Sequence, residues 1–140
     1  MTKFLLAFFL IFGSLVLVAE AHAQAVVIAN PSVKSADISK GDLRDVFSGD
    51  LSSLKDGSFV TPILLKAGPV TNEFLSAYIS KSDAAFRASW RSLVFAGQAY
   101  MPKSLDSEAA VVKFVAHNPG AIGYISKATP HGGVKVLTIR

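Results

Sequence analysis

The segment from Asn118 to Tyr124 constrains the fold of this chain more than any other. Pro119 cannot continue the helix that the apolar spacing before it predicts, because proline has no amide hydrogen and its ring clashes with the preceding turn. Gly120 permits the left-handed backbone with which many helices end. The residues that follow alternate between large apolar side chains and Gly123, as in a buried strand that another element approaches closely. The segment therefore predicts a helix, a sharp stop and a strand in quick succession.

Hydrophobic spacing along the rest of the chain predicts a small α/β domain. Strands are expected at 25–29, 59–65, 122–125 and 134–139. Helices are expected to carry the following apolar residues: Leu43, Val46 and Phe47; Phe74 and Tyr78; Phe86, Trp90, Leu93 and Val94; and Val111, Val112, Phe114 and Val115. We expect the two middle helices to bury their aromatic faces. The order of elements, without an internal repeat, predicts an α/β sandwich in which helices flank a small mixed sheet.

Residues 1–23 predict a secretory signal peptide. Lys3 supplies a positive start, residues 4–18 are almost wholly apolar, and Ala21-His22-Ala23 has small residues at the positions that a signal peptidase recognises. A permanent membrane anchor is the alternative, but the apolar run is shorter than the roughly twenty residues of a spanning helix. We expect cleavage before Gln24, export to the periplasm and a single domain over residues 24–140.

Composition narrows the classes of partner. The chain has no cysteine, so its stability must come from packing rather than from disulfides, and a lipid anchor on cysteine is excluded. It has 14 Lys and Arg against 10 Asp and Glu, a formal net charge of +4, and the basic residues are scattered. This balance favours small anions in a general way, whereas the absence of a basic cluster argues against a nucleic-acid partner.

Three separated motifs together resemble a known family. The segments 42–49, 89–97 and 118–124 are similar to those of the substrate-binding proteins of bacterial phosphate ABC transporters, and more narrowly of their short, single-lobe relatives. The resemblance covers Ala25 to Ile139 and implies one lobe of a type II periplasmic binding protein. It also implies binding of phosphate or a similar oxyanion for an ABC transporter or a membrane sensor. Because the receptors hold their ligand between two lobes, a partner lid or a homodimer would be needed to complete the site.

The loop that opens the second helix is the best candidate for an anion site, because amides at a helix N-terminus attract anions. In the family this loop reads arginine, a few residues, then serine-glycine-threonine, and Thr71 keeps the end of that pattern. Pro69 and Val70 replace the serine and glycine, and proline has no amide to donate. Lys66 lies near the arginine position as a point charge rather than a planar donor. The candidate ligand residues are Lys66, Gly68, Val70, Thr71, Asn72 and, beyond the 122–125 strand, Ser126.

Simpler interpretations remain for these residues. Lys66 is then a solvated cation, and Thr71 and Asn72 cap the helix. Trp90, at helical spacing from Phe86, is expected in the core rather than at a ligand. An enzyme is not expected, since no serine or cysteine nucleophile motif is present, and no histidine pair has metal-ligand spacing, so neither a metal nor a cofactor is expected.

The alternative function is a ligand-free interaction module of the same fold that docks to an envelope partner. The missing second lobe and the altered anion loop favour this interpretation. Its candidate surface is the apolar loop of Tyr100, Met101 and Pro102, which follows the third helix.

Overall fold

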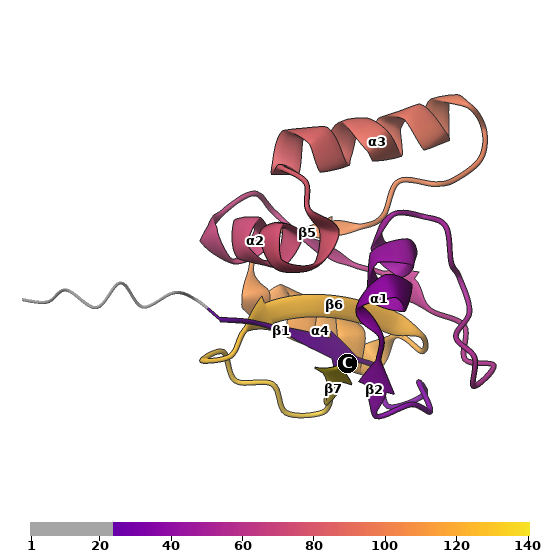
Figure 1. The fold of residues 1–140 in the computed structure, drawn as a ribbon. Helices are drawn as coiled ribbons and strands as arrows, with labels where there is room; N and C mark the ends of the chain where they lie inside the picture. Colours follow the sequence, from indigo (N-terminus) through magenta and orange to yellow (C-terminus); the bar gives the residue numbers. More distant parts are fainter. Residues whose placement is uncertain (1–23) are drawn as a thin grey trace, which may run out of the picture.

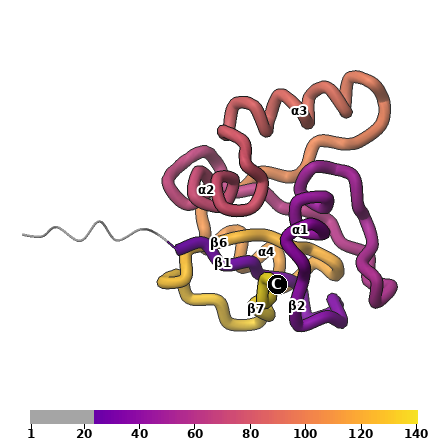
Figure 2. Tube along the Cα trace, viewed as in Figure 1, coloured from indigo at the N-terminus to yellow at the C-terminus, as the bar shows by residue number. Residues whose placement is uncertain are grey.

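A five-stranded mixed sheet forms the centre of the computed structural model, which describes residues 24–140 (Figure 1). The strands lie in the order β2 (Asp37–Ile38), β7 (Lys135–Ile139), β1 (Ala25–Ala29), β6 (Ala121–Ser126) and β3 (Thr61–Pro62). Strand β1 is antiparallel to β6 and β7, whereas β3 is parallel to β6 and β2 is parallel to β7. The first and last parts of the described chain thus meet in the sheet (Figure 2). The predicted fold class is confirmed, and the predicted signal peptide lies outside the described residues.

A second pair of strands extends from the end of β3. Strand β4 (Leu64–Leu65) follows β3 almost directly and pairs in parallel with β5 (Ser104–Leu105). The Leu64 amide donates to the Lys103 carbonyl at 2.8 Å, and the Lys66 amide donates to the Leu105 carbonyl at 2.9 Å. The carboxyl ends of β4 and β5 therefore lie side by side.

Helices cover both faces of the sheet. They are α1 (Lys40–Phe47), α2 (Pro69–Phe74) with its π-helical continuation η1 (Leu75–Ile79), α3 (Asp83–Phe95) and α4 (Glu108–His117). Gly123 in β6 faces α4, where a side chain would meet Val111, and the next residue, Tyr124, stacks on Phe74 of α2. Because successive strand residues face opposite ways, α4 lies on one face and α2 on the other. Helix α3 lies outermost, beyond α1 and α2 (Figure 1).

Three buried aromatic rings join α1 and α2 to the sheet. The rings of Phe74 and Tyr124 are stacked with their centres 4.1 Å apart, and Phe47 meets Phe74 edge-on at 4.8 Å. Burying each ring stabilises the fold by about 1.5–3 kcal/mol, and each aromatic pair adds about 0.5–1.5 kcal/mol. Trp90 of α3 is also buried, as predicted, and its Nε1 donates to the Phe47 carbonyl at 2.9 Å. The core thus fixes both helices relative to β6.

Several local expectations are corrected. Val94 was expected on the buried face of α3, but it is 40% exposed, because the buried stripe runs through Phe86 and Trp90. The strand expected from Phe59 begins at Thr61, and the Phe59 side chain points to solvent. The two-residue strands β2 and β5 were not expected, because two residues carry no periodic signal. None of the helices within residues 24–140 is long and apolar enough to cross a membrane.

A substitution at Gly120 tests the helix stop. The φ of Gly120 is +79°, in the left-handed region, and an added Cβ would lie 2.7 Å from the Phe59 carbonyl oxygen. We expect Gly120→Ala to lower the free energy of unfolding by about 2 kcal/mol or more, as measured by urea titration. Gly57→Ala is the matched control, because its φ is +85° but no atom lies within 4 Å of the added carbon. It should cost only about 1 kcal/mol of backbone strain. Equal losses in the two variants would contradict the close contact.

Candidate anion-binding site

A hollow of about 310 Å³ lies where β4 and β5 end. One side is the chain from Leu65 to Val70, which leads into α2, and the other is formed by Asp106, Ser107 and Glu108 at the start of α4. Parallel strands bring the helices that follow them to the same edge of a sheet, where crevices commonly bind ligands. The N-termini of α2 and α4 therefore face one hollow.

Both helix N-termini have free backbone donors. Within residues 24–140, the amides of Val70 and Thr71 in α2 and of Glu108 and Ala109 in α4 have no hydrogen-bond acceptor. Pro69 has no amide hydrogen and supplies no donor. Unpaired amides of this kind carry the positive end of the helix dipole. The hollow therefore has a positive backbone potential from two directions.

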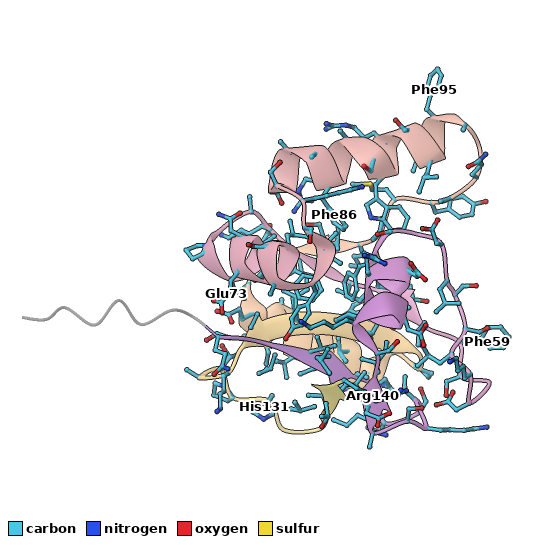
Figure 3. All side chains as sticks on the ribbon, in the orientation of Figure 1. Phe59, Glu73, Phe86, Phe95, His131 and Arg140 are labelled. Carbon is cyan, nitrogen blue, oxygen red and sulfur yellow. The ribbon has the colours of Figure 1, made fainter. Side chains whose placement is uncertain are left out.

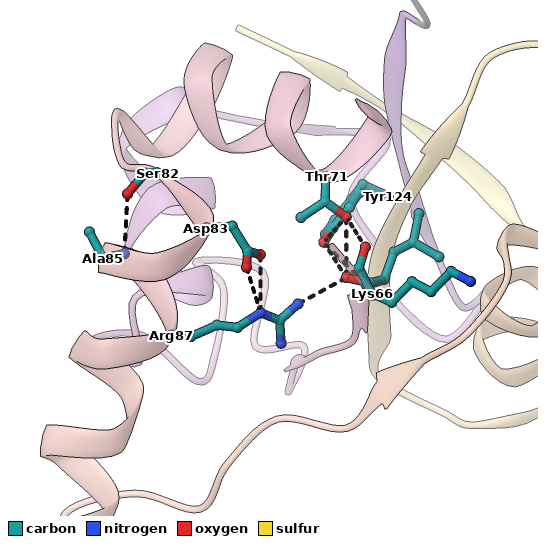
Figure 4. Close-up of polar contacts among 8 residues, drawn as sticks. Lys66, Thr71, Ser82, Asp83, Ala85, Arg87 and Tyr124 are labelled. Atoms are coloured by element: carbon teal, nitrogen blue, oxygen red, sulfur yellow. Dashed lines mark hydrogen bonds and ion pairs between the residues drawn. The ribbon is translucent and has the colours of Figure 1, made fainter. Parts of the chain in front are cut away.

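Thr71 anchors the loop that precedes α2 through its side chain (Figure 4). Its side chain is buried, and its hydroxyl lies 2.7 Å from the Lys66 carbonyl, 3.2 Å from the Leu65 carbonyl and 3.1 Å from the Tyr124 hydroxyl. The Leu65 amide also donates to the Tyr124 hydroxyl at 3.2 Å. The Thr71 side chain is thus committed to internal contacts, and Thr71 as a whole is only 1% exposed and does not line the hollow.

The Leu65 carbonyl receives a further donor from α3. Arg87 Nη2 donates to it at 3.2 Å, and Arg87 Nε is held by Asp83 at 3.0 Å (Figure 4). Burial raises the pKa of the Tyr124 hydroxyl above its usual value of 10.0, although hydrogen bonds from Thr71 and Leu65 oppose that shift. The loop therefore begins at a backbone position fixed by β6, α2 and α3.

Charged side chains at the hollow have both signs. Lys66 is exposed and, in the described part of the chain, makes no salt bridge. Asp106 is exposed, whereas the Glu108 carboxylate accepts hydrogen bonds from the Ser126 amide and from Thr129 Oγ1. The charge of Lys66 is thus outweighed by the carboxylates of Asp106 and Glu108, so any positive potential in the hollow comes mainly from the backbone amides.

The structure separates the six candidate residues. Lys66, Gly68 and Val70 line the hollow together, whereas Thr71 is buried and does not line it. Asn72 is exposed and lines a different hollow with Ser76 and residues 80–83. Ser126 does not line the hollow, and its amide is already paired with Glu108.

The second wall of the hollow, formed by Asp106, Ser107 and Glu108, was not predicted from the sequence. The Ser107 hydroxyl caps α4, where it accepts a hydrogen bond from the Ala110 amide. Ser107 lies opposite Lys66 because β4 pairs with β5. The paired residues are about forty positions apart in the sequence, and each strand is too short to show a periodic pattern, so this pairing could not be predicted.

Tyr100, Met101 and Pro102, expected as a second surface, line a separate hollow of about 340 Å³. Its lining also includes Thr61 and Ala121, the first residues of β3 and β6. This apolar hollow therefore lies at the opposite end of these strands from the anion hollow.

The Tyr124 hydroxyl can be tested by pH. Because its folded pKa is raised, the stability it contributes is complete below about pH 10 and is lost as the pH rises further. We expect Tyr124→Phe to cost about 1 kcal/mol at about pH 8 and to reduce the loss of stability between about pH 8 and about pH 11, measured by urea unfolding. Tyr100→Phe, at an exposed position, should retain the wild-type dependence on pH. The same alkaline loss in wild type and Tyr124→Phe would contradict the raised pKa.

Solved structures with a similar fold are known. The chain is similar to an ABC-type phosphate transport receptor from Vibrio cholerae, with a TM-score of 0.64 and 16% identity over 82% of this chain and 45% of the receptor. It is also similar to a putative phosphate ABC transporter substrate-binding protein with bound phosphate from Clostridium perfringens, with a TM-score of 0.60 and 14% identity over 82% of this chain and 44% of that protein. A possible phosphate binding protein from Planctomyces limnophilus gives a TM-score of 0.57 and 13% identity over 83% of this chain and 41% of that protein.

No protein-family model matches the sequence, and a search of curated proteins found no match. The chain spans less than half the length of the solved receptors to which it is similar. At these identities the likeness concerns the fold. Residues 24–140 therefore have the mixed α/β fold of one lobe of a periplasmic binding protein, of the kind found in phosphate transport receptors.

Proposed function

We propose that this chain is an exported binding module that takes up phosphate or a similar oxyanion at the hollow between α2 and α4. The proposal rests mainly on one observation. The N-termini of α2 and α4, both with amides unpaired within residues 24–140, meet at one hollow, and Lys66 lies at the same hollow. Solved proteins with this fold are named for phosphate transport or phosphate binding, which supports the same class of ligand. Their names describe receptors and binding proteins, which supports a role in binding rather than catalysis.

The chemistry of the hollow favours an oxyanion that retains a proton. Free amides of α2 and α4 donate to the oxygens, and Lys66 supplies a charge at the rim. The carboxylates of Asp106 and Glu108 repel a fully ionised anion, but a carboxylate accepts a hydrogen bond from an OH group. Hydrogen phosphate has such a proton at neutral pH, whereas sulfate does not. We therefore expect phosphate to bind more tightly than sulfate.

Binding at this hollow is expected to be weak. Pro69 removes one donor, the hollow is open to solvent, and the chain spans less than half of the receptors that share its fold. A dissociation constant of about 1 mM corresponds to about −4.1 kcal/mol, the scale expected from a few charge-assisted hydrogen bonds. A second copy or a lid from a transporter or membrane sensor would tighten it by excluding water.

Titration calorimetry at constant ionic strength tests this proposal. We expect saturable heat with phosphate, less with sulfate and none with added chloride. Lys66→Ala should weaken phosphate binding about fivefold, because a solvent-exposed charge contributes about 1 kcal/mol. The matched control is Lys55→Ala, which removes an exposed lysine that does not line the hollow. No heat at phosphate concentrations up to about ten times the expected dissociation constant, or equal losses in both variants, would contradict the proposal.

The second candidate function is a ligand-free interaction module, and internal pairing at the site favours it. The Thr71 hydroxyl donates to a backbone carbonyl, and the Ser126 amide donates to the Glu108 carboxylate, so neither donor is free for a ligand. Crosslinking of the exported protein in intact cells, followed by recovery from the envelope, distinguishes the two functions. A specific envelope partner without phosphate binding would favour the module, whereas a monomer that binds phosphate and recovers no partner would favour the binding protein.

A further inference from the structure

Large apolar side chains are exposed where α3 ends. Phe95 is 96% exposed, Tyr100 is 95% exposed, and Val94 and Met101 are about two-fifths exposed. We call these four residues the α3 tip. The chain turns back directly after the helix, where the Gln98 amide donates to the Leu93 carbonyl, so the tip is one short region. Phe95 points away from the body of the protein at the end of the outermost helix (Figure 3). Exposed apolar groups gathered in this way mark contact surfaces.

The surroundings of the tip are basic. Arg91 is exposed one helical turn before Phe95, on the same face, and Lys103 lines the apolar hollow with Tyr100 and Met101. The sequence has no acidic residue between Asp83 and Asp106. Carboxylates do approach α3 on one flank, where Asp45 and Asp50 share a hollow with Ser89, Ser92 and Leu93 and with two basic side chains, Arg44 and Lys81. The α3 tip therefore has exposed aromatic rings with two basic side chains, Arg91 and Lys103, beside it.

We infer that the α3 tip docks on the surface of a membrane that contains anionic phospholipids. Phe95 and Tyr100 enter the interfacial region, where aromatic side chains are favoured, and Arg91 and Lys103 contact the phosphates of the head groups. Phe95 projects from the end of α3 (Figure 3) and Tyr100 is 95% exposed, so a lipid surface can reach both rings without rearrangement of the fold. Charge complementarity selects this occupant, because the lipid surface is negative where the tip is positive.

A second copy of the chain fits the tip less well. A two-fold interface brings the same patch of both copies together. Arg91 and Lys103 of one copy would then lie near the same cations of the other, and like charges repel where residues 84–105 supply no acidic side chain to pair them.

Membrane docking leaves the anion hollow open. Met101 and Tyr100 line the hollow at the first residues of β3 and β6, whereas the anion hollow lies at the end of β4. The inference is thus independent of the proposed phosphate site, and either can fail without the other.

Vesicle co-sedimentation tests the inference. The full chain is expressed for export, purified, and its N-terminus is determined by mass spectrometry. We expect it to sediment with vesicles of phosphatidylcholine and phosphatidylglycerol but not with phosphatidylcholine alone, and to be released when salt is raised, because salt screens the head-group charge. All variants share the same N-terminus, so any lipid binding by residues 4–18 is common to them and the differences report on the tip.

The variants separate the apolar and the charged contributions. The double variant Phe95→Ser and Tyr100→Ser, and separately Arg91→Glu, should each lose at least about tenfold in vesicle affinity. Phe59→Ser is the matched control, because Phe59 is 80% exposed away from the tip, and it should bind as wild type does. Phe95→Trp supplies a direct reporter, since Trp90 is buried and a blue shift with anionic vesicles then comes from position 95.

Three results would overturn the inference. The first is no sedimentation with anionic vesicles, and the second is an equal loss in Phe59→Ser. The third is dimerisation in lipid-free solution, measured by sedimentation velocity, that Phe95→Ser abolishes, because this would assign the tip to a second copy. Thermal unfolding accompanies each measurement, and since Phe95 and Arg91 are exposed, both single variants should keep the wild-type midpoint.

Discussion

The Tyr124 hydroxyl is hydrogen-bonded to the backbone amide and carbonyl of Leu65, and this buried contact ties the sheet to the loop before α2. It joins the central strand β6 to the end of β4, and the same hydroxyl meets Thr71 at the start of α2. Its ring stacks on Phe74, so one residue fixes both the strand end and the helix that follows it. A buried polar group is tolerable only when it is hydrogen-bonded, and here the available partners are the backbone groups of the loop itself. The geometry of the loop is therefore a consequence of core packing.

The positive potential of the anion hollow follows from that geometry. The paired ends of β4 and β5 bring two helix N-termini to one hollow, where the unpaired amides at its lining residues Val70 and Glu108 act as fixed dipoles. The side chains contribute less, because Lys66 is opposed by Asp106 and Glu108. In our proposal, backbone donors of this kind give the hollow its affinity for an oxyanion, although Pro69 and Val70 stand where the loop that this segment resembles has serine and glycine. It also explains why the expected affinity is low.

Elements were predicted correctly where the residue types themselves restrict the local backbone or form a clear apolar pattern. Pro119 and Gly120 ended the last helix where the structure ends it, and the apolar run at β1 formed the strand expected of it. Trp90 lies in the core because helical spacing places it with Phe86. The pairing of β4 with β5 depends on contacts between distant residues, which local patterns do not carry, so Ser107 and Glu108 were not recognised as a wall of the hollow. Val94 and Phe95 are residue types that are usually buried, and their exposure follows from how α3 packs on the rest of the protein, which the sequence does not show.

If the unpaired amides of α2 and α4 bind one anion together, amide NMR spectra of the isotope-labelled protein will show it during a phosphate titration. At constant ionic strength, we expect the largest saturable shifts at Val70, Thr71, Glu108 and Ala109, and all four should follow a single dissociation constant. Shifts at α2 without shifts at α4, or saturable shifts only in other parts of the chain, would contradict it.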